Sequence, residues 1–104
     1  MNPNRWDTVC HLPDTEPDDS NADTYARPDL FSGASPDARF IFDAVYLPAE
    51  CRFLLTLMEI NEEWGFVEHE SVCRPATRAE LLRLATAFQA APEQMLHRPP
   101  DGAD

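Results

Sequence analysis

The stretch that most constrains this chain runs from Phe53 to Glu70, where its densest run of large apolar residues meets its densest group of carboxylates. It reads FLLTLMEINEEWGFVEHE. No lysine or arginine lies between Arg52 and Arg74, although five glutamates fall inside that interval. A fold built on this stretch must therefore bury one set of side chains while it displays an uncompensated acidic rim.

The same stretch is predicted to form a β-hairpin, because acidic residues followed by Trp64-Gly65 are typical of a turn and both flanking segments have strand length. The length of the turn decides which side chains share a face, since a slip of one residue turns every side chain over. We prefer an odd-length turn to a two-residue turn, because it groups on one face Phe53, Leu55, Leu57, Val67 and Cys73. The other face would then be mixed apolar and acidic, with Leu54, Met58, Ile60, Trp64, Phe66, Arg52, Thr56, Glu68 and Glu70.

The segment 39–47 is predicted to be a strand. Its aromatic and apolar residues alternate at period two, with Phe40, Phe42, Ala44 and Tyr46 on one face. A helix beginning with Pro36 at its first position is the competing interpretation. A second helix, opening at Pro48 and ending at Gly65, would likewise compete with the first strand of the hairpin.

The segment after Pro75 is predicted to be a helix. Thr77 and Glu80 form a Thr-x-x-Glu capping box, which marks a helix N-terminus. The apolar residues that follow recur at helical spacing until Pro92 stops the run, and they are Leu81, Leu84, Ala85 and Phe88. One further turn is expected over 92–96.

Residues 1–34 carry seven acidic residues against two arginines, and few apolar ones. Such a composition offers too little apolar area to offset the entropy of ordering, so we expect a disordered acidic arm or one loosely docked on the domain. A single small domain is expected over 35–97, and a frayed tail over 98–104. The predicted fold class is α+β, a small antiparallel sheet of about three strands packed by one C-terminal helix.

The charge balance excludes several functions. The formal net charge is -11, so binding to nucleic acid or to an anionic membrane is disfavoured and a basic protein is the expected partner. No lysine occurs, which excludes Schiff-base chemistry. No signal peptide or membrane span is indicated, and an odd count of three cysteines argues against a secreted disulfide framework, so a cytoplasmic location is expected.

No catalytic, cofactor or metal site is predicted. Cys10, His11, His69 and Cys73 are zinc-ligand types, but their spacing does not match the close pairs of structural zinc sites. Glu68 and Glu70 have a carboxyl spacing that glycosidases use, yet a domain this small leaves little room for a substrate cleft. Ordinary thiols and a solvated acidic edge are the favoured interpretations, and an enzyme is not expected.

The sequence favours a small acidic inhibitor that occupies the basic, nucleic-acid-binding surface of an enzyme, in the manner of nucleic-acid mimicry. Phage anti-defence proteins, such as those directed against CRISPR systems, and toxin-immunity proteins are analogies of charge and size. The alternative is a structural adaptor or antitoxin-like subunit with a permanent apolar interface, and a homodimer is compatible with both. Trp64 could instead belong to the core. The residues expected to bind the partner are Glu59, Glu62, Glu63, Trp64, Phe66, Glu68 and Glu70.

Overall fold

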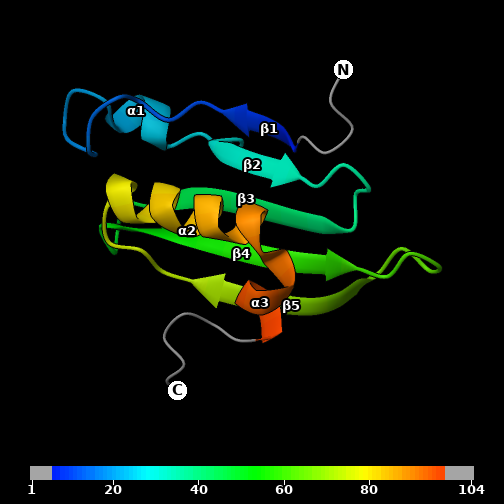
Figure 1. The fold of residues 1–104 in the computed structure, drawn as a ribbon. Coiled ribbons are helices and arrows are strands. Elements are labelled where there is room, and N and C mark those ends of the chain that lie inside the picture. Colours follow the sequence, from blue (N-terminus) through cyan, green and yellow to red (C-terminus); the bar gives the residue numbers. More distant parts are fainter. Residues whose placement is uncertain (1–5, 98–104) are drawn as a thin grey trace.

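The computed structural model describes residues 6–97, and the predicted tail 98–104 lies outside them. Five strands form one antiparallel sheet in the order β1-β2-β3-β4-β5, with helices packed on one of its faces (Figure 1). In chain order the elements are β1 (Asp7–Cys10), α1 (Ala22–Tyr25), β2 (Phe31–Ala34), β3 (Phe40–Leu47), β4 (Arg52–Ile60), β5 (Val67–Cys73), α2 (Arg78–Ala90) and α3 (Pro92–His97). The α+β class is therefore confirmed, whereas the expectation of about three strands falls short by two.

Three local predictions are confirmed. The segment 39–47 forms β3, and neither competing helix is present. Helix α2 begins with the predicted box, because the Thr77 hydroxyl accepts a hydrogen bond from the Glu80 N–H at 3.1 Å. In a standard capping box the Glu80 carboxylate would accept a hydrogen bond from the N–H of the N-cap residue, Thr77. Here it accepts from the N–H of the preceding residue, Ala76, at 3.0 Å. Helix α3 supplies the further turn expected after Pro92.

The expectation of an arm that is disordered or loosely docked is only partly supported, because the described part of the arm supplies two strands of the sheet. Its acidic tract is fixed at the N-terminus of α2, where the Glu16 carboxylate accepts hydrogen bonds from the backbone N–H groups of Arg78 and Ala79 at 2.7 and 3.2 Å. An anion is stabilised there because the first N–H groups of a helix have no intrahelical partner. Tyr25 is buried and donates to the Thr15 carbonyl at 2.6 Å. These hydrogen bonds of Glu16 and Tyr25 cannot be deduced from composition alone.

Gly33 explains how β2 can lie so close to the core. A Cβ atom at this position would come within 2.5 Å of Cε2 of Phe42, so the aromatic ring packs directly against the backbone of β2. Phe31 on the same strand makes an edge-to-face contact with Phe42, with ring centroids 5.0 Å apart. The second strand is thus held by aromatic packing that only glycine permits.

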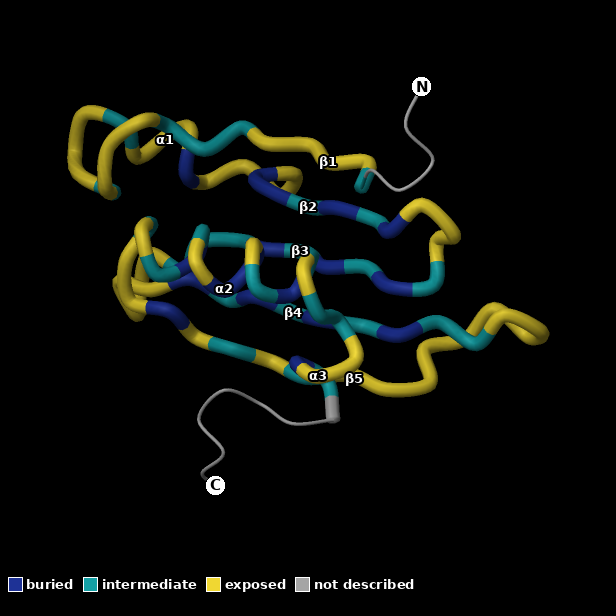
Figure 2. The backbone as a smooth tube through the Cα atoms, in the orientation of Figure 1, coloured by how far each residue is buried: buried dark blue, intermediate teal, exposed yellow. Residues whose placement is uncertain are grey.

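The core lies between the sheet and α2. We call this side of the sheet the covered face, and Figure 2 shows the buried residues alternating with half-buried ones along β3 and β4. Rings of Phe40 and Phe42 contact Phe88 of α2 in edge-to-face geometry. The completely buried residues of the strands are Phe42, Ala44, Phe53, Leu55 and Leu57.

The opposite side of the sheet, which we call the open face, has no covering layer among residues 6–97. Register places on it, strand by strand, Asp7, Val9, Ser32, Ala34, Ile41, Asp43, Val45, Leu47, Arg52, Leu54, Thr56, Met58, Ile60, Val67, Glu70 and Val72. Its β3 and β4 residues, apart from exposed Arg52, are half-buried, since neighbouring strands shield them from the sides only. No helix in the described part of the chain has the length and apolarity to cross a membrane.

The hairpin register follows the prediction in one half of β5 and departs from it in the other. Leu55 lies opposite Cys73 on the covered face, as expected. Val67, however, pairs with Ile60 on the open face, where the prediction placed it on the covered one. The physical reason is a β-bulge beside Ile60, where β5 contributes one extra residue, Glu68. The extra residue shifts the alternation of side chains between the two faces, so that Val67 lies on the open face.

Candidate docking surface and hairpin tip

The open face combines an apolar centre with acidic positions. One row across all five strands consists of Asp7, Ala34, Ile41, Met58 and Glu70. The next row consists of Val9, Ser32, Asp43, Thr56 and Val72. Carboxylates therefore stand at both ends of the first row and at the middle of the second, and they outnumber the face's one described guanidinium, that of Arg52.

Asp43 is the most unusual residue of this face. It lies on the central strand between Ser32 and Thr56 of the neighbouring strands, and its side chain has no hydrogen-bond or ion-pair partner among the described residues. Desolvation by burial raises the pKa of Asp43 above its ordinary value. A partly desolvated carboxylate without a cation is an unfavourable arrangement for the isolated chain.

The tip of the β4–β5 hairpin displays two aromatic rings. The Asn61 side-chain oxygen accepts hydrogen bonds from the N–H groups of Glu63 and Trp64 at 2.9 and 2.7 Å, which fixes the turn. Gly65 has φ +77, a left-handed conformation that favours glycine. Trp64 is 73% exposed and Phe66 54% exposed, so the interpretation of Trp64 as a core residue is excluded.

Exposed apolar residues occur on the open face and at the hairpin tip. Among residues 6–97, five large apolar residues are prominently exposed: Val9, Trp64, Phe66, Val67 and Val72. Three of them lie on the open face, and the other two form the hairpin tip. Exposed apolar residues gathered on one surface and rimmed by polar groups are typical of protein-interaction sites.

Six of the seven predicted partner-binding residues are exposed, namely Glu62, Glu63, Trp64, Phe66, Glu68 and Glu70. Glu59 is the exception and is only 4% exposed. It lies on the covered face, because β4 alternates regularly and places it in line with Leu57 and Leu55. Glu59 therefore does not belong to the acidic rim, contrary to the expectation.

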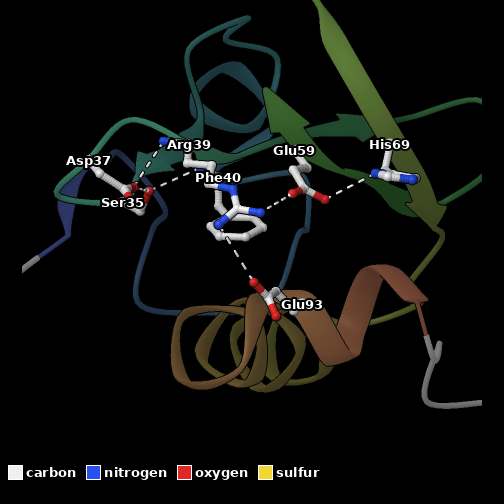
Figure 3. Close-up of polar contacts among 7 residues, drawn as sticks. All are labelled: Ser35, Asp37, Arg39, Phe40, Glu59, His69 and Glu93. Atoms are coloured by element: carbon white, nitrogen blue, oxygen red, sulfur yellow. Dashed lines mark hydrogen bonds and ion pairs between the residues drawn. The ribbon is translucent and has the colours of Figure 1, made fainter. Parts of the chain in front are cut away.

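Glu59 instead joins the sheet to its surroundings through an ionic network (Figure 3). Its Oε2 accepts a hydrogen bond from Nη2 of Arg39 at 2.7 Å, and its Oε1 lies 3.0 Å from Nδ1 of His69. Arg39 also faces Glu93 of α3 at 3.7 Å. Burial alone would raise the pKa of Glu59, but the hydrogen bonds from Arg39 and His69 outweigh it and leave the pKa below its usual value.

Two features escaped sequence reasoning. The pairing of Arg39 with Glu59 joins residues twenty positions apart, and no local pattern reports it. Asp43 could have been noticed, because the residues that alternate with the inward phenylalanines of β3 are apolar except at that position. A strand that is apolar on both faces indicates that both faces need cover.

Comparison with known proteins gives no further guide, because no family model, no curated protein and no solved structure matches this chain.

Proposed function

We propose that this chain is a protein-binding inhibitor whose open face and hairpin tip dock on the basic, nucleic-acid-binding surface of an enzyme. The observation that carries the proposal is Asp43, a carboxylate without a partner among the described residues, at the centre of an apolar sheet face. A lysine or arginine of the partner would compensate this charge at the moment the surface is desolvated.

Charge favours a basic partner over a second copy of the chain. Two copies would each bring a formal charge of -11, and the symmetric contact of two open faces would set carboxylates near carboxylates. An enzyme surface that binds nucleic acid carries positive charge and already binds a polyanion. Glu62, Glu63 and Glu70 add to the attraction that steers association.

Trp64 is the expected anchor of the complex. A large aromatic ring at the tip of a fixed turn can enter a pocket of the partner at little cost in conformational entropy, and such residues dominate alanine scans. Trp64→Ala should weaken binding by about 2 kcal/mol or more, mainly through faster dissociation. Charge reversal at Glu62, Glu63, Glu68 or Glu70 should instead slow association and weaken its dependence on salt.

The experiment compares the immobilised protein with its variants as bait in a lysate of the host. Asp43→Arg and Trp64→Ala alter the proposed surface, and Asp19→Arg is the matched control, since Asp19 is an exposed carboxylate in the loop before α1. We expect the wild type and the control to retain a nucleic-acid enzyme that duplex DNA or RNA displaces. The purified enzyme should then be inhibited at stoichiometric concentration, and both surface variants should lose that inhibition.

The adaptor is the second candidate, and it is favoured by the apolar residues Ile41, Val45, Leu54, Met58 and Ile60 on the open face. Such an interface would resist salt, and polyanions would not compete with it. A neutral or acidic partner retained at high salt would therefore reject the inhibitor and favour the adaptor.

A further inference from the structure

A cluster of potential metal ligands lies next to the turn of the β4–β5 hairpin, away from the open face. It consists of Glu59, Glu68 and His69, whose ligand atoms all lie within 4.8 Å of one another. Glu59 and His69 are opposite each other across β4 and β5. The chain thus brings two carboxylates and one imidazole together on neighbouring strands.

The β-bulge is what makes this grouping. In a regular strand, consecutive side chains point to opposite faces, so Glu68 and His69 could not serve one site. Glu68 is the extra residue of the bulge, and its carboxylate reaches the position where Glu59 and His69 meet. Bulges recur next to functional sites because they re-aim side chains in this way.

Arg39 orients the buried member of the cluster. Its Nη2 holds Oε2 of Glu59 at 2.7 Å and leaves Oε1 directed toward Nδ1 of His69 at 3.0 Å (Figure 3). Two ligand atoms about 2.0 to 2.2 Å from one ion lie about 3.3 to 3.6 Å apart in a tetrahedral site, so this pair would have to separate by only a few tenths of an ångström. A hydrogen bond from outside the ligand set that fixes a ligating carboxylate is a usual feature of metal sites.

Several carboxylates lie close to the cluster. Arg39 interacts with Glu59 and Glu93 at short range and is also influenced by Glu62. Glu68 adds a further carboxylate beside His69. A divalent cation between Glu59 and Glu68 would be attracted by both carboxylates.

We propose that Glu59, Glu68 and His69 bind one divalent transition-metal ion, with Zn²⁺ as the best fit. An imidazole nitrogen with two carboxylate oxygens suits Zn²⁺ or Co²⁺ better than the all-oxygen preference of Mg²⁺ and Ca²⁺. Binding requires the lone pair of His69 Nδ1, so the ring proton resides on Nε2 in the bound form. Three protein ligands leave a fourth position open for water or for a group of a partner. This proposal does not depend on the proposed function.

The test is titration of the metal-free protein with Zn²⁺ by calorimetry and with Co²⁺ by absorption. Cys10→Ser and Cys51→Ser form the background, since these exposed thiols could bind metal on their own. We expect one ion per chain, and at least about tenfold weaker binding after either His69→Ala or Glu68→Gln. Both side chains are exposed, so circular dichroism should show an unchanged fold.

His11→Ala is the matched control. His11 also stands beside a carboxylate, that of Asp29 at 3.8 Å, but belongs to no cluster of three ligands among the described residues. This variant should bind Zn²⁺ as the parent does. The proposal is overturned by absence of stoichiometric binding, by unchanged affinity in both site variants, or by a thiolate-to-Co²⁺ charge-transfer band, which would place the ion on a cysteine.

Discussion

The two faces of the sheet treat a carboxylate in opposite ways. Glu59 on the covered face has Arg39 and His69 as partners, and its pKa lies below the usual value. Asp43 on the open face has no charged partner within residues 6–97, and its pKa is raised by burial. On the covered face the carboxylate has cationic partners within the chain, whereas on the open face residues 6–97 supply none, and we propose that another molecule does.

The largest expected difference between the faces is in packing. Phe42 is fully buried and touches the rings of Phe31 and Phe88, so Phe42→Ala should lower the free energy of unfolding by about 3 to 5 kcal/mol. Ile41→Ala, one residue away on the open face, should cost less, because Ile41 is only half-buried. Urea unfolding of both variants measures the contrast, and equal losses would mean that the open face is packed like a core.

A smaller effect is expected from the charge on the covered face. Glu59→Gln removes the charge that Arg39 and His69 share, and should cost about 1 to 3 kcal/mol at neutral pH. Because the folded-state pKa of Glu59 lies below its ordinary 4.5, its contribution is present above that pH and is lost on further acidification. In EDTA, the stability difference between wild type and variant should therefore shrink progressively as the pH falls below 4.5. A constant difference would indicate that shape rather than charge is responsible.

The smallest effect on the free energy of unfolding is expected from substitution of Asp43, and it should be a stabilisation. Its folded-state pKa is raised above the ordinary 3.8, so the ionised form is disfavoured in the folded chain at neutral pH and this penalty disappears below that value. Asp43→Asn should stabilise the free chain by less than about 1 kcal/mol at pH 7, and less at pH 3. Destabilisation by Asn at pH 7 would show that the charge has a partner and would remove the main support for the docking proposal.

Sequence reasoning succeeded where the signal is local. The capping box of α2 and the alternation of β3 concern neighbours in sequence, and both were predicted. Sequence reasoning failed where a contact joins distant residues. Glu16, for example, caps α2 and thereby orders an arm whose composition indicates disorder. The exposed rim of the candidate surface was predicted from its charges. Asp43 and the burial of Glu59 depend on which face the helix covers, and composition does not report that.

The simple strand order has a consequence for how the chain comes to be folded. Neighbours in the sheet are neighbours in sequence, and the shortest connections join β2 to β3 and β3 to β4. The connection from β1 to β2 is longer and contains α1, so its closure costs more entropy. During synthesis β1 and β2 emerge before β3, so they can join the sheet only after β3 has been made, and the covered face stays exposed to water until α2 emerges. The apolar residues of the covered face are therefore accessible to chaperones until the helix that covers them has been synthesised.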